Sequence, residues 1–179
     1  MPIADNTLDN VILVNPEGEA IGTYPKLQAH LDGKLHRAFS IFIFNAAQEL
    51  LIHQRNPEKY HSGGLWTNTC CSHPREGETV IAAANRRLQE EMGFHTPMRE
   101  LFTFIYRESL ANGLVENEYD HVLIGHYEAA PKPDPSEVSD WRWMSLPALQ
   151  KEIQQYPEMF TCWLPLALQE LLSQHPQLD

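Results

Sequence analysis

The stretch Thr79-Val-Ile-Ala-Ala-Ala-Asn-Arg-Arg-Leu-Gln-Glu-Glu-Met-Gly93 decides the fold of this 179-residue chain. Apolar residues recur in it at helical spacing, with charged residues between them. The apolar residues are Val80, Ala83, Ala84 and Leu88. This spacing predicts an amphipathic helix over residues 79–92. Gly93 favours a helix end there, because glycine is common just after the last helical residue. Glu78 comes just before the helix, where a carboxylate suits the helix dipole.

Short apolar runs on both sides of this helix predict strands. They cover residues 11–14, 35–44, 50–54, 101–106, 121–127 and 141–144. The segment 45–49 between two of these runs predicts a hairpin, and the polar, glycine-ended segment 56–64 predicts a loop. Residues 24–31 fit either a short helix or an irregular loop.

Two more helices are expected near the C-terminus. Ser145 favours the N-cap of one and Pro147 its first turn, and residues 160–173 form a second, apolar run. Strands and helices together indicate a mixed α+β chain with a mainly antiparallel sheet. We expect one domain over residues 1–179, with a short N-terminal extension over residues 1–9, because the length suits a single domain.

Composition narrows the class of protein. The formal net charge of −11 argues against nucleic acid as a partner, since binding to phosphates needs a basic surface. No apolar stretch is long enough for a membrane span, and the N-terminus lacks the pattern of a signal peptide. The three cysteines are odd in number and two are adjacent, which favours a reducing, cytoplasmic location over a disulfide framework.

Two pairs of reactive side chains occur at strand spacing. Cys71 and His73 stand two residues apart in Trp66-Thr-Asn-Thr-Cys-Cys-Ser-His-Pro74, and Glu116 and Glu118 have the same spacing. Side chains at i and i+2 point to the same face of an extended strand. The spacing therefore suggests a metal site beside an acid–base site.

Further histidines add possible ligands. His30 and His36 flank a turn-like Asp-Gly step, although nine histidines in the chain make chance neighbours common. Together with His73 and the two glutamates they offer three nitrogens and two or more oxygens. Such a set suits a six-coordinate Mn²⁺ or Mg²⁺, or a Zn²⁺ ion.

The remaining cysteines and aromatic residues have simpler interpretations. Buried cysteine is usually an inert small apolar residue, which we expect for Cys162 and for Cys70, facing away from Cys71. Trp66, Tyr106 and Trp163 are core residues by default. A ring face beside a cationic intermediate would give them a second role.

The helix over residues 79–92 resembles the Nudix box, whose pattern is G-x5-E-x7-R-E-U-x-E-E-x-G-U. Five residues fall at the right spacing, namely Glu78, Arg86, Glu90, Glu91 and Gly93. Ser72 replaces the first glycine, and Arg87 replaces a glutamate that supports the metal of pyrophosphohydrolases. The resemblance thus supports the fold and argues against diphosphate hydrolysis.

The chain as a whole resembles the type 1 isopentenyl-diphosphate delta-isomerases, from about Val11 to Trp163. The resemblance rests on Lys26-x3-His30, His36-x-Ala-Phe-Ser40, the Trp66–Pro74 string, Glu91-Met-Gly93 and Val115-Glu-Asn-Glu118. It implies a Nudix-like α/β/α sandwich with a mixed, mainly antiparallel sheet. It also implies interconversion of isopentenyl and dimethylallyl diphosphate.

Roles follow from the matching motifs. The resemblance implies an acid–base pair of Cys71 and Glu118 assisted by Tyr106, and a tightly bound metal on His30, His36, His73, Glu116 and Glu118. It implies that Glu91 helps to hold a Mg²⁺ that arrives with the diphosphate. The implied substrate contacts are Lys26, Arg55, Lys59, Arg87, Trp66 and Trp163.

Two alternatives have a different chemistry. One is a Nudix hydrolase that acts on a nucleoside diphosphate derivative, and the other is a metal-binding scaffold without catalysis. Arg87 and Ser72 count against the first, and the complete set of acid, base and ligand positions counts against the second. The expected partner is a small diphosphate substrate, and the chain is either a monomer or a homodimer.

Overall fold

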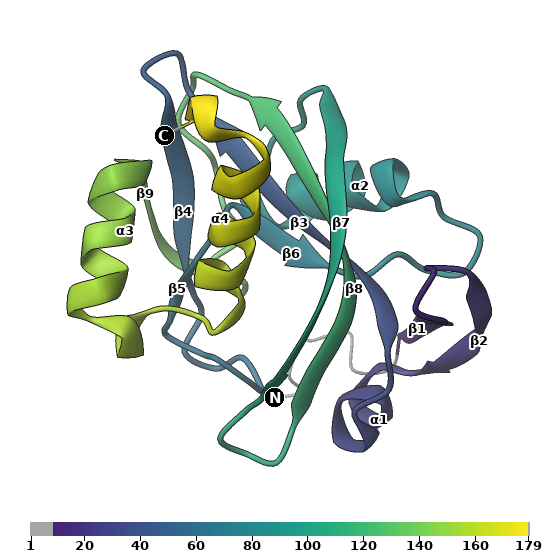
Figure 1. Cartoon of the computed structure of the whole chain (residues 1–179). Coiled ribbons are helices and arrows are strands. Elements are labelled where there is room, and N and C mark those ends of the chain that lie inside the picture. Colours follow the sequence, from purple (N-terminus) through teal and green to yellow (C-terminus); the bar gives the residue numbers. More distant parts are fainter. Residues whose placement is uncertain (1–8, 179) are drawn as a thin grey trace.

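A nine-stranded sheet runs through the computed structural model, which describes residues 9–178 (Figure 1). The predicted N-terminal extension, residues 1–9, lies outside these residues except for Asp9. The strands are β1 Asn10–Val14, β2 Ala20–Pro25, β3 His36–Phe44, β4 Glu49–Arg55, β5 Trp66–Thr67, β6 Cys70–Ser72, β7 Met98–Ser109, β8 Val115–His126 and β9 Val138–Ser145. The helices are α1 Lys26–Asp32, α2 Val80–Met92, α3 Leu146–Gln155 and α4 Trp163–Gln174, with short 3₁₀ turns η1 Pro157–Met159 and η2 Pro176–Leu178.

The predicted helix α2 is confirmed with both of its ends. The Thr79 hydroxyl accepts a hydrogen bond from the backbone N–H of Ala82, which caps the first turn. Gly93 ends the helix at φ 75°, a left-handed conformation that suits glycine. Glu78 has other partners than the helix amides, because it accepts hydrogen bonds from Arg86 and from the backbone of Arg75.

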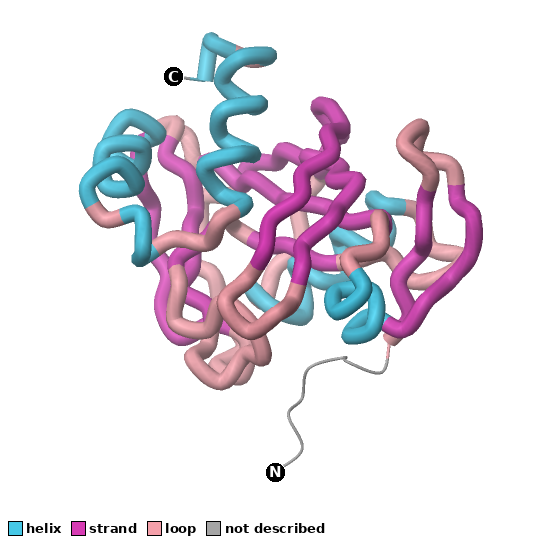
Figure 2. Tube along the Cα trace, turned by 60° about the horizontal axis from the view of Figure 1, so that its bottom comes forward, coloured by secondary structure: helices cyan, strands magenta, loops and turns pink. Residues whose placement is uncertain are grey.

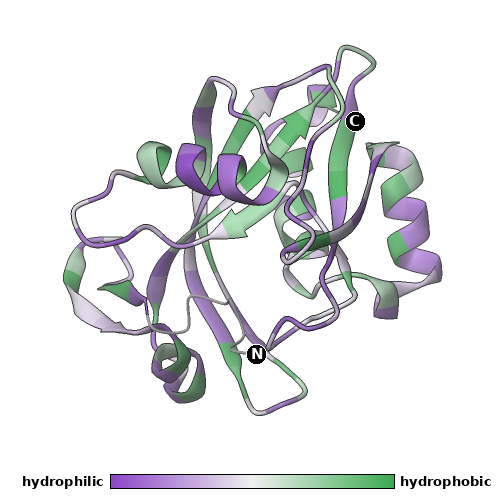
Figure 3. Cartoon of the chain, turned by 180° about the vertical axis from the view of Figure 1, so that it is seen from behind, coloured by the Kyte–Doolittle hydropathy of each residue, from purple (hydrophilic) through white to green (hydrophobic). Residues whose placement is uncertain are grey.

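The core lies on both faces of the sheet, because side chains of β3 alternate between them. Ile41 and Ile43 pack with the buried side of α2, whereas Phe42 and Phe44 pack with α3 and α4. Figure 3 shows that the outer side of α2 is hydrophilic while the strands behind it are largely apolar. Figure 2 shows the strands as an inner layer with helices at its sides. The result is the expected α/β/α sandwich.

The sheet is mixed, and among its described strands one pair, β3 and β8, is parallel. This pairing runs from His36↔Glu118 to Phe44↔His126. The predicted turn between β3 and β4 is present, but only Phe44↔Leu50 pair across it. Beyond that pair β4 diverges to pair with β9 and β5, because β8 and β6 occupy the edges of β3.

The divergence positions the segment that carries Cys71. β5 pairs with β4 and β6 pairs with β3, so residues 66–72 cross from one part of the sheet to the other. Cys70 faces the apolar cluster under α2, and Cys71 faces the opposite way, as the strand alternation predicts.

Some element boundaries differ from expectation. Of the two structures expected for residues 24–31, a short helix or a loop, the helix is present as α1, which begins after Pro25. The strand β2 was not predicted, and its side chains are largely exposed, so it lacks an apolar pattern. The final helix begins at Trp163, after η1, rather than at Phe160. Within residues 9–178, every helix is too short or too polar to span a bilayer.

Candidate active site

A pocket of about 510 Å³, counting its open mouth, gathers most of the predicted site residues. The predicted residues that line it are Lys26, Arg55, Lys59, Cys71, His73, Arg87, Glu91, Tyr106, Glu116, Glu118 and Trp163. His30 and His36 lie just beneath it and are completely buried.

Trp66 does not line the pocket. It is part of the core on the α4 side, and the guanidinium of Arg142 lies 4.5 Å from its ring centroid.

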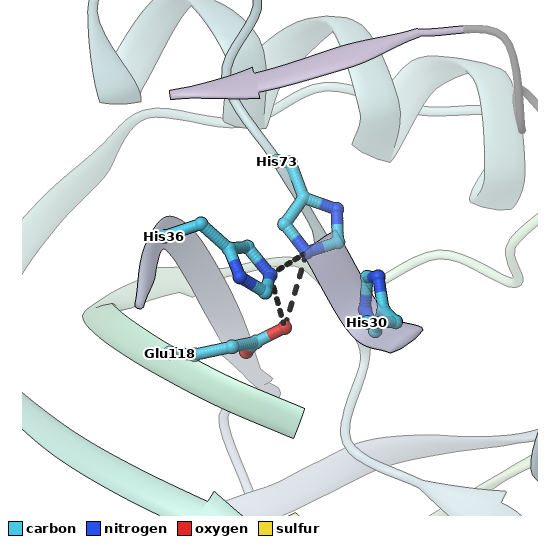
Figure 4. Close-up of side chains that lie close together, drawn as sticks. All are labelled: His30, His36, His73 and Glu118. Carbon is cyan, nitrogen blue, oxygen red and sulfur yellow. Dashed lines mark hydrogen bonds and ion pairs between the residues drawn. The ribbon is translucent and has the colours of Figure 1, made fainter. Parts of the chain in front are cut away.

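Three histidines and one glutamate converge at the floor of the pocket (Figure 4). His36 Nε2 lies 3.2 Å from His73 Nε2, and Glu118 Oε1 lies 3.0 Å from His73 Nε2 and 3.6 Å from His36 Nε2. One ligand atom from each of these residues and from His30 lies within 4.8 Å of the others. Four predicted metal ligands are thus within reach of one ion.

The backbone fixes the orientation of two of these imidazoles. His30 Nδ1 lies 2.7 Å from the carbonyl oxygen of Lys26, and His36 Nδ1 lies 2.8 Å from that of Lys34. A carbonyl only accepts, so each Nδ1 carries the proton and donates it. Each Nε2 then has a lone pair for a metal, which is the usual second-shell arrangement of a histidine ligand.

The fifth predicted ligand, Glu116, lies beside His30 and also contacts a residue that the sequence did not predict. Glu116 Oε2 is 3.6 Å from His30 Nε2, and Glu116 Oε1 is 3.4 Å from His61 Nε2. His61 follows Lys59 and Tyr60 in a polar loop, and no motif or spacing singles it out. His30, His61 and Glu116 form a second group that could hold a metal.

The buried atoms of this cluster fit a divalent cation. His30 Nε2 and Glu116 Oε2 are buried and have no hydrogen-bond partner in the described chain. Buried polar atoms without partners are rare, and a bound ion is one of the explanations for them. Imidazole nitrogens and carboxylate oxygens together suit Mn²⁺, Zn²⁺ or Mg²⁺.

Cys71 is half-buried and lies in a polar environment. Its thiol donates to Asn68 Oδ1 at 3.1 Å, and Ser40 Oγ lies 3.5 Å from Sγ. The amide of Asn68 donates to two backbone carbonyls, so its oxygen must face the thiol. Burial and the neighbouring carboxyl of Asp120 raise the pKa of Cys71 well above its ordinary value, which keeps it a thiol.

Glu118, unlike Cys71, has a lowered pKa and is ionised. The hydroxyl of Tyr106 donates to Glu118 Oε2 at 2.7 Å. Burial raises the pKa of Glu118, but its contacts with His36, with Glu116 and with the Tyr106 hydroxyl outweigh burial and lower the pKa to about 2. Burial and the charge of Glu118 raise the pKa of Tyr106 well above its ordinary value. The pocket therefore presents a thiol, a carboxylate and a neutral phenol.

Cationic side chains gather at the same pocket in an otherwise acidic chain. Arg87 pairs with Glu91, and Glu137 bridges Arg87 and Lys59. Burial lowers the pKa of Arg87, but the charges of Glu91 and Glu137 outweigh this and raise it. The guanidinium of Arg55 lies 5.5 Å from the ring of Trp163. Positive charge and an aromatic face are thus combined in one wall.

Comparison with known proteins places this geometry in context. Residues 34–164 match the NUDIX domain family. The chain is 46% identical to isopentenyl-diphosphate Delta-isomerase 1 of Aromatoleum aromaticum, over 92% of this chain and 93% of that protein. It is 45% identical to isopentenyl-diphosphate Delta-isomerase of Serratia proteamaculans, over 90% of each chain.

Solved structures agree on the fold. The crystal structure of DR0079 from Deinococcus radiodurans superimposes with a TM-score of 0.69 over 82% of this chain and 90% of its own, at 20% identity. A MutT NUDIX hydrolase from Burkholderia pseudomallei gives a TM-score of 0.58 over 75% of this chain and 96% of its own, also at 20% identity. Such low identity supports the α/β/α fold alone.

Proposed function

This chain belongs to the NUDIX domain family and, within it, to the isopentenyl-diphosphate Delta-isomerases, and on that premise we propose that Cys71 and Glu118 carry its proton transfers. The protein is an isomerase that interconverts isopentenyl diphosphate and dimethylallyl diphosphate. One observation supports the assignment above all. A single pocket holds a neutral thiol and an ionised carboxylate, which are a proton donor and a proton acceptor.

The reaction needs this combination because an unactivated alkene is a weak base. Protonation of one alkene carbon gives a tertiary carbocation, and loss of a proton from the neighbouring carbon restores the double bond at its new place. An acid and a base must both reach the substrate, and water must be excluded because it would trap the cation. In the reverse direction the two groups exchange roles.

Tyr106 and Trp163 support the proton transfers. Tyr106 holds one oxygen of Glu118 by its hydroxyl, so the carboxylate keeps one orientation. Trp163 lines the pocket with only 3% of its surface exposed, and its ring face suits a carbocation.

The cations of the pocket suit the diphosphate. Lys26, Arg55, Lys59 and Arg87 line it together with Glu91, which we assign to a Mg²⁺ that arrives with the substrate. Fixing the diphosphate there places the five-carbon chain deeper in the pocket, toward the thiol and the carboxylate. This local cluster accounts for the binding of an anion by a chain with a net charge of −11.

We assign the second metal to His30, His36, His73, Glu116 and Glu118, whose unpartnered buried atoms were described above. A divalent cation bound there would withdraw charge from the carboxylates and so adjust the acidity of Glu118. Arg87 argues against the alternative of diphosphate hydrolysis, because a guanidinium ion-paired with Glu91 occupies the place of a metal-supporting glutamate.

The test is conversion of isopentenyl diphosphate in deuterated water by the purified protein and by Cys71→Ser and Glu118→Gln. The wild type should form dimethylallyl diphosphate and incorporate deuterium. Each variant should lose about 10²- to 10⁴-fold in kcat, the usual contribution of a general acid or base. Near-normal turnover in either variant would contradict its assignment, and release of phosphate from nucleoside diphosphate derivatives would favour the hydrolase.

A further inference from the structure

His61 has no role in the reaction described so far, yet it lies at the pocket and contacts Glu116. We propose that His61 is a positioning residue, whose Nε2–H holds Glu116 Oε1 and so turns Glu116 Oε2 toward the metal. The inference rests on the proposed ligand set, because it concerns how one of those ligands is held. Nothing in the motifs of the chain assigns His61 this part.

The partners of His61 determine where its proton lies. Its Nε2 is 3.4 Å from Glu116 Oε1, slightly longer than a usual hydrogen bond, and a carboxylate only accepts. Its Nδ1 lies 3.3 Å from Ser62 Oγ, whose hydroxyl can donate to it. Both contacts agree on a ring that carries its proton on Nε2 and directs it at Glu116.

The ring is held in place from three sides. Tyr60 packs perpendicular to it with centroids 4.5 Å apart, and Trp163 does so at 6.0 Å. His30 stacks against it at 5.8 Å. Only 8% of the His61 side chain is exposed. It therefore has little freedom to turn away from Glu116.

The backbone on the C-terminal side of His61 is fixed as well. Ser62 has φ 53°, which is uncommon for a residue with a side chain. Gly63 lies so close to the carbonyl of Pro57 that an added Cβ would stand 2.5 Å from the oxygen. A loop with these constraints cannot slide without breaking contacts, so it presents His61 at one position.

The two oxygens of Glu116 distinguish positioning from direct ligation. Oε1 faces His61, whereas Oε2 is buried without a hydrogen-bond partner and lies 3.6 Å from the equally unpartnered Nε2 of His30. The atoms left for an ion are therefore Oε2 and the His30 nitrogen. His61 occupies the outer oxygen, as second-shell donors do at metal sites.

Two complementary substitutions test the proposal by binding of Mn²⁺ alone, without substrate, measured from the signal of the free ion. His61→Gln keeps an N–H near the position of Nε2 but loses the ring, whereas His61→Phe keeps a ring and loses the donor. We expect His61→Phe to weaken Mn²⁺ binding by about 10- to 100-fold, the usual cost of removing a second-shell partner. His61→Gln should stay within about threefold of the wild type, since donation to the carboxylate survives.

The outcomes separate the alternatives. Wild-type affinity in His61→Phe would overturn the proposal, and so would an equal loss in both variants, which direct ligation predicts. His61→Leu replaces His61→Phe if the larger ring prevents folding, with unfolding of the metal-free proteins in urea as the check. The matched control is His121→Gln, because His121 also contacts a carboxylate, that of Glu100, but from the other face of β8.

A further variant tells failure of this inference from failure of the ligand set. His36→Ala removes a proposed ligand and should abolish Mn²⁺ binding whatever His61 does. Retained binding in His36→Ala would contradict the ligand set, and with it the inference. Loss in His36→Ala with no effect in His61→Phe would contradict the inference alone.

Discussion

At the scale of single residues, the hydrogen bond from Tyr106 to Glu118 holds the carboxylate to which we assign a proton transfer. Both side chains are buried, and the phenol donates to the carboxylate at 2.7 Å. A hydrogen bond to a charged group contributes about 1.5–3 kcal/mol. The orientation of Glu118 in the proton transfer should therefore depend on this one hydroxyl.

Tyr106→Phe removes the hydroxyl and keeps the ring. We expect kcat to fall by about 10- to 100-fold, because about 1.4 kcal/mol corresponds to a factor of ten, while KM changes little. Steady-state kinetics of isopentenyl diphosphate conversion measure both. Tyr127→Phe is the control, since Tyr127 stacks on Phe94 under α2. A change in KM alone would show that Tyr106 serves binding instead.

Residue spacing predicted which side chains share a face where the backbone is extended. Cys71 and His73 face the pocket together, and so do Glu116 and Glu118, because strands repeat every two residues. His61 was missed because it is an isolated histidine in a loop, and loop geometry has no period. Trp66 was assigned to the substrate by resemblance, whereas its ring packs in the core beside Arg142.

At the scale of elements, the two ends of α2 control how the helix lies on the sheet. Gly93 ends the helix in a left-handed conformation and packs closely on the carbonyl of Lys132. An added Cβ there would lie 2.1 Å from that oxygen, so the connector to β9 would have to move. This connector also carries Glu137, which contacts Lys59 and Arg87 at the pocket.

Gly93→Ala should lower the free energy of unfolding by more than about 2 kcal/mol, because a left-handed alanine alone costs roughly 1–2 kcal/mol and the contact with Lys132 adds to it. Urea denaturation measures the change. Thr79→Ala, at the other end of α2, serves for comparison and should cost about 1 kcal/mol as a lost N-cap. An unchanged free energy of unfolding in Gly93→Ala would contradict the close approach of Gly93 to the Lys132 carbonyl.

The start of α2 depends on pH through Glu78. Hydrogen bonds from Arg86 lower the pKa of Glu78 below the ordinary value of 4.5. A carboxylate whose pKa is lowered on folding stabilises the protein above its unfolded pKa, and this contribution is lost as pH falls through the folded pKa. Acid should therefore weaken this contact.

Glu78→Gln should reduce the free energy of unfolding by about 0.5–1 kcal/mol at pH 7, because the pair is partly exposed and screened by solvent. The difference from the wild type should shrink as pH falls below 4.5. Urea denaturation at pH 7 and at pH 4 provides the comparison. A difference that grows in acid would contradict the assignment of the shift to Arg86.

Elements with strong local patterns were predictable, and pairings between distant segments were not. The prediction of a helix over residues 79–92 was correct because its apolar spacing and its terminal glycine agree. The parallel pairing of β3 with β8 was not predicted, so the divergence of β3 and β4 was missed as well. The exposed strand β2 lacks the alternation that makes a strand visible in sequence.

At the scale of the whole molecule, we propose that residues 1–179 form one domain. α2 packs on one face of a single sheet and α4 on the other, so neither apolar cluster is complete without the strands they share. The proposed metal ligands come from α1, β3, β8 and the segment after β6, which the sheet brings together. Binding of an ion should therefore stabilise the entire fold.

Removal of divalent metals by a chelator should lower the thermal midpoint and abolish isomerisation, and added Mn²⁺ should restore both. An ion present at about 100 times its Kd adds roughly 2.7 kcal/mol, and in a chain of this size each kcal/mol corresponds to about 2–4 °C. We expect a shift of about 5–10 °C by differential scanning calorimetry. His36→Ala should show no such shift, and an unchanged midpoint in the wild type would contradict a resident metal.

The parallel pairing of His36 with Glu118 also bears on the order of events during synthesis. These two residues are far apart in the chain, and closing so long a loop has a high entropic cost that only the completed sheet offsets. A nascent chain that ends before β8 carries His30, His36 and His73 but neither glutamate. Loading of the proposed metal site would therefore wait until β8 has paired with β3, a contact of high sequence separation.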